Sequence, residues 1–196
     1  DNGQTWSEPV SIPSDPYHTI SGQDIDAASD GNGEIIAASR TRLYKSNDFG
    51  DTWTSSSLFA VPNPYFQPPH GSRIAYNGAG KWVHVYSYMQ NYGFGGLDGY
   101  FLTWYAGVSN DGENWTKVKL QSSYNSPLVV GTFDIAASGN FIGILGSFHN
   151  GSSNRSFGLI KSLDGGASFS PPTPVPLRNL TNWSAAVSGT RWIVVG

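Results

Sequence analysis

The feature of this sequence that most constrains its fold is a short turn string that occurs four times. In chain order the copies read "DNGQTW" (1 to 6), "SNDFGDTW" (46 to 53), "SNDGENW" (109 to 115) and "SLDGGASF" (162 to 169). Each copy combines Asp, Gly and a final aromatic residue, and we call these four strings the box turns. Recurrence of one string along a chain predicts a repeat protein, in which each repeat is one supersecondary unit.

A second pattern alternates with the box turns and consists of two apolar stretches around a glycine. Its alanines are 47, 61 and 50 residues apart, and the box-turn aspartates are 47, 63 and 53 residues apart, so both patterns follow one period. A glycine between two short apolar stretches predicts a tight hairpin, and a small alanine suits a place where sheets converge. The aligned positions are Ala28, Ala75, Ala136 and Ala186, followed by Gly31, Gly78, Gly139 and Gly189.

Composition and period together predict an all-β chain. The 24 Gly and 12 Pro, against one Met, favour short strands joined by turns. A unit of about 50 residues with four short strands has the size of one β-propeller blade. We name the strands of a blade A to D: A and B form the hairpin, C precedes the box turn and D follows it.

The predicted fold is therefore a β-propeller of four-stranded antiparallel blades, with about three complete blades and partial blades at both ends. Complete blades are expected at 24–60, 72–121 and 132–175, and partial blades at 1–12 and 183–196. The two partial blades together supply strands A, B and D but no C. We therefore expect a single propeller segment that is a fragment of a larger propeller, and its contacts to include the remaining blades or an oligomeric partner.

Charge and composition exclude several classes of partner. The net charge is −3 with 13% charged residues, which gives no basis for binding nucleic acid. No apolar run reaches the roughly 20 residues that span a bilayer, so we expect no membrane insertion. Without cysteine there is no disulfide or thiolate site, and we expect no metal and no cofactor. Five N-x-S/T sequons are close to the chance number and leave localisation open, although a secreted, cell-surface or virion-associated protein fits.

Every position of a box turn has a structural explanation. The Asp carboxylate can accept hydrogen bonds from turn amides, Gly supplies a backbone angle that other residues avoid, and hydroxyls satisfy the remaining groups. The final aromatic residue buries a large area between sheets. A calcium loop of the EF-hand type is not expected, because it needs a longer ligand series ending in a bidentate Glu. The residues predicted to be structural are Asp1, Gly3, Trp6, Asp48, Gly50, Trp53, Asp111, Trp115, Asp164, Gly166 and Phe169.

These strings resemble the Asp-box, or BNR, repeat of sialidase-type β-propellers. The first two copies match the full pattern, the fourth has Ser168 and Phe169 in place of Thr and Trp, and the third is one residue shorter. The resemblance covers essentially the whole chain. It implies a propeller fold and a ligand site on the face opposite the box turns.

Strand order predicts which loops form that opposite face. Box turns and A–B turns share one face, and the B–C loops (86 to 100 and 146 to 156) share the other with the D–A linkers (13 to 23, 61 to 72, 121 to 132 and 171 to 182). Aromatic rings beside amide and guanidinium groups suit sugar rings, and they also suit a protein contact. The alternative is that Pro-Tyr linkers only join adjacent blades. The candidate ligand-binding residues are Tyr17, His18, Tyr65, His70, Tyr92, Phe94, His149, Arg155 and Arg178.

A complete sialidase site is not expected within this segment. The resemblance implies an arginine cluster, a Tyr nucleophile activated by Glu, and an acid/base Asp. The three glutamates, Glu8, Glu34 and Glu113, all lie away from the predicted ligand face.

Two aspartates leave another glycoside hydrolase open. Asp26 and Asp134 occupy the same repeat position on innermost strands, and Arg73 occupies it in the blade between them. Two carboxylates across a channel can serve as acid and base. The alternative is that these charges pair with Arg73 and fill the channel. We therefore assign no catalytic residue and favour a non-catalytic module that binds glycan or protein. The alternative is a sialidase-like or other glycoside hydrolase, whose catalytic set either uses Asp26 and Asp134 or is completed outside this segment.

Overall fold

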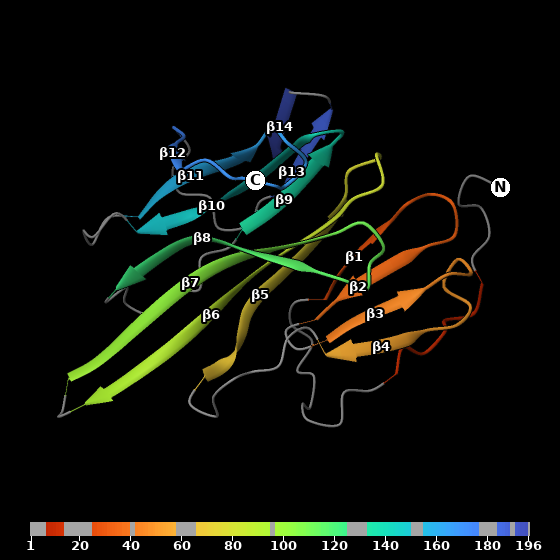
Figure 1. Ribbon diagram of the computed structural model, residues 1–196, viewed down its shortest axis with the longest axis horizontal. Coiled ribbons are helices and arrows are strands. Elements are labelled where there is room, and N and C mark those ends of the chain that lie inside the picture. Colours follow the sequence, from red (N-terminus) through yellow and green to blue (C-terminus); the bar gives the residue numbers. More distant parts are fainter. Residues whose placement is uncertain are drawn as a thin grey trace.

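A computed structural model describes residues 7–13, 25–39, 42–57, 66–94, 97–124, 133–149, 155–176, 184–188 and 191–195. These residues form three four-stranded sheets and one two-stranded sheet, all antiparallel, and within these ranges no helix occurs (Figure 1). The all-β prediction is confirmed. The described part of the chain accordingly holds no helix that could cross a membrane.

The strands of each sheet follow chain order. Blade 1 contains β1 (Asp26–Ser29), β2 (Ile35–Ala38), β3 (Arg42–Ser46) and β4 (Thr54–Ser57). Blade 2 contains β5 (Phe66–Tyr76), β6 (Trp82–Phe94), β7 (Leu97–Ser109) and β8 (Thr116–Tyr124). Blade 3 contains β9 (Phe133–Ser138), β10 (Phe141–His149), β11 (Arg155–Ser162) and β12 (Thr173–Pro174), and a final hairpin pairs β13 (Ser184–Ser188) with β14 (Arg191–Val195).

The first strands of successive sheets contact one another. β1 contacts β5, β5 contacts β9, and β9 contacts β13, so these four are the innermost strands of successive propeller blades. The fold is thus of the β-propeller type, and the described residues form three four-stranded blades and a further hairpin. Residues 7–13 belong to no strand, unlike the strand D expected at 7–12, because this segment pairs with no other described strand.

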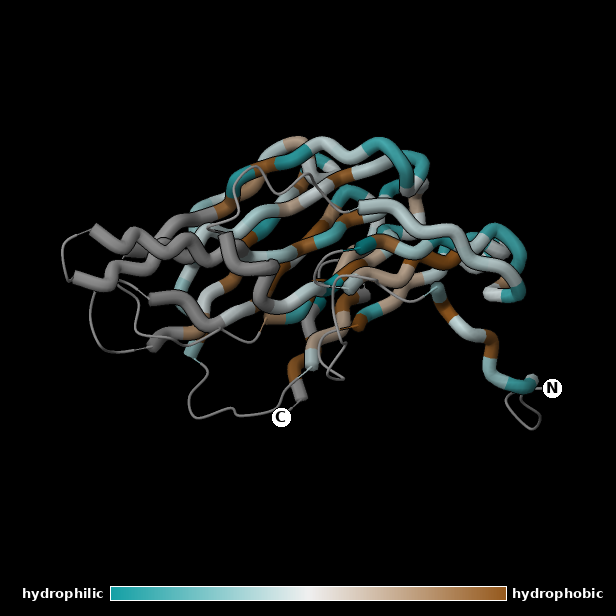
Figure 2. The backbone as a smooth tube through the Cα atoms, turned by 90° about the horizontal axis from the view of Figure 1, so that it is seen from below, coloured by the Kyte–Doolittle hydropathy of each residue, from teal (hydrophilic) through white to brown (hydrophobic). Residues whose placement is uncertain are grey.

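Hydrophobic side chains fill the spaces between blades. One buried cluster between blades 1 and 2 includes Ile36, Ile74, Trp82 and Tyr86. A second cluster between blades 2 and 3 contains Val83, Val85, Trp104, Ala106, Phe133, Ile135, Ile142, Ile144 and Ile160. Figure 2 shows hydrophobic stretches along the strands, with hydrophilic residues gathered at the turns. Alternate residues of one strand therefore face different neighbouring blades.

The box turns and the A–B turns lie together at one end of the blades. The amide of Phe49 donates to the carbonyl of Gly33 (2.9 Å), and the amide of Gly165 donates to that of Asn140 (2.9 Å). Each bond joins the box turn of a blade to its own A–B turn. We call this end the box-turn face.

The opposite end differs from the sequence prediction in the length of its strands. Residues 86 to 100 were expected as a loop, but β6 and β7 pair in register from Trp82↔Ser109 to Phe94↔Leu97. Likewise β10 and β11 pair as far as His149↔Arg155, inside the loop expected at 146 to 156. Continued cross-strand pairing keeps these segments extended despite their glycines. Blade 2 therefore reaches further at this end than blade 1, whose β2 and β3 have four and five residues.

Candidate functional site

The second box turn is held by its own serine and aspartate. The hydroxyl of Ser46 donates to Asp48 Oδ1 (2.7 Å) and accepts from the amide of Gly50 (2.8 Å). Thr52 donates its amide to Asp48 Oδ1 (2.9 Å) and its hydroxyl to Asp48 Oδ2 (2.5 Å). Both carboxylate oxygens are therefore engaged within the turn.

The other two described box turns repeat these contacts. In the third, Ser109 donates to Asp111 (2.9 Å) and the Asn114 side-chain amide replaces the threonine hydroxyl (2.8 Å). In the fourth, Ser162 donates to Asp164 (2.7 Å) and Ser168 takes the threonine position (2.5 Å). The first box turn, with Asp1, Gly3 and Trp6, lies outside the described residues.

Hydrogen bonding keeps these aspartates ionised. The bond from the Thr52 hydroxyl is the largest cause that lowers the pKa of Asp48, to about 2. The bond from the Asn114 side chain lowers the pKa of Asp111, and the bond from the Ser168 hydroxyl lowers that of Asp164, each further below the usual range. A carboxylate that accepts several hydrogen bonds favours its charged form. These groups are unsuited to proton transfer near neutral pH.

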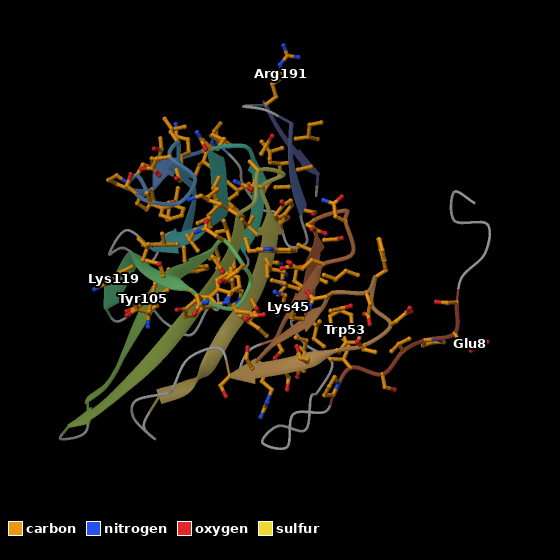
Figure 3. All side chains as sticks on the ribbon, turned by 45° about the vertical axis from the view of Figure 1, so that its right-hand side comes forward. Glu8, Lys45, Trp53, Tyr105, Lys119 and Arg191 are labelled. Atoms are coloured by element: carbon orange, nitrogen blue, oxygen red, sulfur yellow. The ribbon has the colours of Figure 1, made fainter. Side chains whose placement is uncertain are left out.

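The aromatic residue at the end of each described box turn is fixed to the turn or to the core. Trp53 Nε1 donates to the carbonyl of Gly50 (2.8 Å), and Trp115 Nε1 donates to that of Gly112 (3.1 Å). Trp115 packs against the cluster between blades 1 and 2, and Phe169 packs against the cluster between blades 2 and 3. Trp53, which is labelled in Figure 3, is half-buried.

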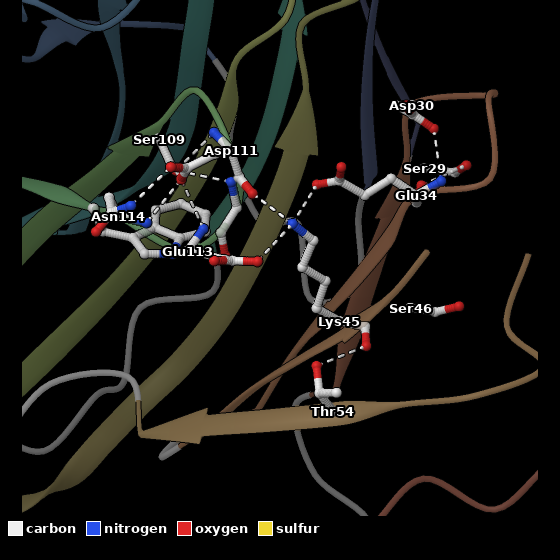
Figure 4. A network of polar contacts seen from close by, with 12 residues as sticks. Ser29, Asp30, Glu34, Lys45, Ser46, Thr54, Ser109, Asp111, Glu113 and Asn114 are labelled. Atoms are coloured by element: carbon white, nitrogen blue, oxygen red, sulfur yellow. Dashed lines mark hydrogen bonds and ion pairs between the residues drawn. The ribbon is translucent and has the colours of Figure 1, made fainter. Parts of the chain in front are cut away.

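One lysine connects blade 1 to the box turn of blade 2, as Figure 4 shows. Lys45 Nζ donates to the carbonyl of Asp111 (2.6 Å) and lies 3.3 Å from Glu113 Oε1 and 3.5 Å from Glu34 Oε1. Sequence reasoning missed this contact because its partners come from different repeats. Two of the three glutamates are thereby part of an ion-pair cluster on the box-turn face.

The alternative catalytic residues lie at one register position of the innermost strands. Asp26 Oδ2 accepts the amide of Ile74 from the next blade (2.9 Å). Asp134 Oδ2 accepts the amide of Ala185 (2.6 Å) and the hydroxyl of Ser184 (3.0 Å), again from the following innermost strand. We call these carboxylate-to-amide contacts the inter-blade braces. In both cases the donor is the amide of the residue that directly follows the equivalent position in the next innermost strand. The two braces therefore have the same geometry.

Arg73 occupies the equivalent position in blade 2 and makes different contacts. Its Nη1 donates to the carbonyl of Ser72 (2.7 Å), and the guanidinium lies 6.0 Å from the ring centroid of Phe133. The sequence suggested that Asp26 and Asp134 pair with the Arg73 guanidinium. Among the described contacts, Asp26 instead accepts a backbone amide of the next blade, and Arg73 donates to a backbone carbonyl.

The charges at this position nevertheless influence Asp26. Burial raises the pKa of Asp26, while the hydrogen bond from Ile74 and the positive charge of Arg73 oppose the rise. The negative charge of Asp134 raises it slightly further. A carboxyl with a raised pKa that is influenced by the charge of a second carboxylate is an arrangement from which an acid and a base can be built.

Five candidate ligand-binding residues fall on described strands at the end opposite the box turns. His70 lies on β5, Tyr92 and Phe94 end β6, and His149 of β10 pairs in register with Arg155 of β11. Tyr17, His18, Tyr65 and Arg178 lie outside the described residues. Among the described side chains, no three His, Cys, Asp or Glu gather in a way that could hold a metal ion.

Comparison with known proteins gives distant structural likenesses. No protein-family model matches the chain, and no curated protein sequence matches it. The chain is similar to the solved structure of an endo-arabinase from Bacteroides thetaiotaomicron VPI-5482, at 12% identity and a TM-score of 0.31 over 89% of each chain. It is also similar to a thermostable family-43 glycoside hydrolase, at 10% identity and a TM-score of 0.30 over 87% of this chain and 81% of that one.

Proposed function

We propose that this chain is a non-catalytic binding module of the Asp-box (BNR), sialidase-like propeller type, which holds a glycan or protein ligand at the face opposite the box turns. The inter-blade braces are the observation that carries this proposal. Asp26 and Asp134 each accept an amide of the next blade, at 2.9 and 2.6 Å, so both carboxylates have a structural partner. A catalytic pair would have to serve substrate through carboxylates that each already use one oxygen, Oδ2, to hold the next blade.

The box turns support the Asp-box assignment. The three described turns share one set of hydrogen bonds, in which the aspartate accepts from the serine hydroxyl and from a later turn amide. The set persists where the third turn is one residue shorter, because Asn114 supplies the side-chain donor. Conserved contacts with changed residues favour a common structural motif over a ligand site.

The opposite face supplies the binding residues. The long β6–β7 hairpin carries Tyr92 and Phe94 to its tip, and the β10–β11 hairpin carries the register pair of His149 and Arg155. Aromatic, imidazole and guanidinium groups provide the stacking and planar hydrogen bonding that a glycan needs. The same groups are enriched at protein interfaces.

A hydrolase is the second candidate, and the raised pKa of Asp26 is the observation that favours it. A general acid must keep its proton near working pH, which a carboxyl in water does not. Burial raises the pKa of Asp26 in that direction, and Asp134 stands at the equivalent position two blades on. In this alternative, Asp26 is the acid and Asp134 the base or nucleophile of a glycoside hydrolase.

Two measurements on one set of variants separate these functions. The parent chain and its variants are applied to a glycan array and to a panel of chromogenic glycosides. Tyr92→Ala and Phe94→Ala test the binding face, and Asp26→Asn and Asp134→Asn test catalysis. Ser56→Ala, on the exposed outer strand β4, is the control. The binding proposal expects glycan retention that falls in the first pair, with no turnover in any variant. Turnover that disappears in Asp26→Asn or Asp134→Asn would establish the hydrolase instead. If a folded chain retains no glycan, the glycan version of the proposal fails, which leaves a protein contact or a scaffold role.

A further inference from the structure

The second box turn contains a bulky residue in a backbone conformation that bulky residues avoid. Phe49 has a φ of +59° and is the only non-glycine residue with a positive φ in the described part of the chain. Its side chain is also unusually open for an aromatic residue, at 73% exposed. An aromatic residue in the left-handed region is a genuine outlier, and such outliers cluster where a function requires them.

The box turn itself does not require an aromatic residue at this position. The fourth box turn has Gly165 there, with a φ of +68°, and the first has Asn2 in the aligned position. Glycine and asparagine are the residues that adopt this conformation most readily. The one hydrogen bond that Phe49 makes here uses its backbone amide, and Gly165 makes the corresponding bond at the same 2.9 Å. The phenyl ring is therefore an addition to a turn that forms without it.

The ring rests on the neighbouring A–B turn and leaves its other side to solvent. Phe49 Cε2 lies 3.2 Å from the position that a Cβ on Gly33 would occupy, so the ring covers this buried glycine. Asn32 precedes Gly33 and is exposed, as are Asn47 and Asp51, which flank Phe49 in the box turn. The two turns that meet at this exposed aromatic ring thus carry two exposed amide side chains and one exposed carboxylate within two residues of Gly33 or Phe49.

This combination matches the chemistry of a sugar more closely than that of a protein. A sugar ring offers C–H groups on one face, which stack on an aromatic ring, and hydroxyls at its rim, which bond to planar amides and carboxylates. A protein interface needs on the order of 1,000 Å² and clustered apolar anchors. In the described box turns, Phe49 and Leu163 are the exposed large apolar residues, and they belong to different blades. The nearby carboxylates of Asp48 and Asp51 disfavour an anionic sugar.

We propose that Phe49 is the stacking platform of a carbohydrate contact on the box-turn face, which takes a neutral sugar residue whose hydroxyls are bound by Asn32, Asn47 and Asp51. This contact lies at the end of the blades opposite the face proposed above for ligand binding. It stands on its own observations and does not depend on that face.

The test combines retention on immobilised glycans with thermal melting. The probes are neutral oligosaccharides of glucose, galactose and mannose, and acidic oligosaccharides that carry sialic or uronic acids. Phe49→Asn should weaken retention of the neutral probes about tenfold, by removing the stacking surface. Its Tm should equal or exceed that of the parent, because Asn adopts the left-handed conformation with less strain. Phe49→Trp should keep retention, and Leu163→Ala, an exposed apolar residue of another box turn, should leave it unchanged.

Three results would overturn the proposal. Retention that is the same in the parent and in Phe49→Asn removes the stacking role. If both the Tm and the retention fall in Phe49→Asn, and the Tm of Phe49→Trp is also below that of the parent, Phe49 is a packing residue. Acidic probes retained through Phe49 as well as neutral ones contradict the assigned sugar class. Tyr92→Ala, measured in parallel, tests the opposite face. If the binding proposed for that face fails, the dependence of retention on Phe49 can still be measured.

Discussion

Lowering the pH from 7 to 5 is expected to destabilise the protein through one buried histidine. His84 lies on β6 with 1% of its surface exposed, stacked on Tyr86 at 5.0 Å between ring centroids. Its Nε2 is 2.8 Å from the hydroxyl of Ser72, while Nδ1 is buried with no hydrogen-bond partner. A protonated imidazole carries two N–H donors and a charge, and this site provides a partner for one donor only. Burial accordingly lowers the pKa of His84 to about 3.

The sign and size of the effect follow from linkage. The folded-state pKa of His84 is about 3, below the ordinary 6.5, so the unfolded chain takes up the proton first as the pH falls. This contribution to the free energy of unfolding is complete above about pH 6.5 and is lost progressively between about 6.5 and 3. Between pH 7 and 5 the loss is about 2 kcal/mol, at about 1.4 kcal/mol per pH unit below 6.5. For a chain of this size that corresponds to about 4 to 8 °C in Tm.

Urea unfolding of the parent and of His84→Gln at both pH values isolates this contribution. Glutamine offers Ser72 a polar partner but does not titrate. The free energy of unfolding of His84→Gln should therefore change between pH 7 and 5 by about 2 kcal/mol less than that of the parent. Ser72→Ala serves as control, because it lowers stability at both pH values and leaves the histidine to titrate. Equal pH dependence in the parent and in His84→Gln would refute the reasoning, whatever the stability of either protein at pH 7.

Three further substitutions test the packing of turns and blades by urea unfolding. Gly112→Ala should lower the free energy of unfolding by about 2 kcal/mol or more, because its φ is +69° and a Cβ would collide with an isoleucine of β2. Gly78→Ala has a similar φ of +71° but open space around the position, so it should cost only about 1 kcal/mol. Trp115→Ala should cost about 3 to 5 kcal/mol, and more than Trp53→Ala, because only the first packs against a described core cluster. Asp134→Ala should cost about 1 kcal/mol or more by leaving the β13 amide without its acceptor. Equal costs for the two glycines, a larger cost for Trp53, or a neutral Asp134→Ala would each contradict the corresponding contact.

Repetition made the fold predictable from the sequence. The column of Gly31, Gly78 and Gly139 was expected to form hairpin turns, and all three have a positive φ between paired strands, at 79°, 71° and 57°. The period located the blades because a hairpin and a box turn recur together. Strand length was not predictable, since Gly93 and Gly99 in the β6–β7 hairpin suggest a loop, while pairing with the opposite strand keeps both residues extended.

The candidate site was predictable only as a set of positions. Alignment of the repeats placed Asp26 and Asp134 at one register, but their partners are amides one repeat further on, which no local pattern indicates. The Lys45 contact to the third box turn is hidden for the same reason. The strain at Phe49 does have a sequence signal, because Gly165 stands at the aligned position. Comparing what differs between repeats thus finds functional candidates that the shared pattern conceals.

The braces also explain why Arg73 differs from its equivalents. Asp26 and Asp134 hold the following innermost strand at the end opposite the box turns, but Arg73 cannot accept an amide, so blades 2 and 3 lack this brace. Their polar contact lies at the box-turn end instead, where the Asn77 side chain donates to the carbonyl of Gly139 (2.7 Å) and the Gly139 amide donates back to the carbonyl of Asn77 (2.7 Å). Arg73 thus places a positive charge where the neighbouring blades have a bracing carboxylate, and this charge opposes the rise in the pKa of Asp26 that burial causes.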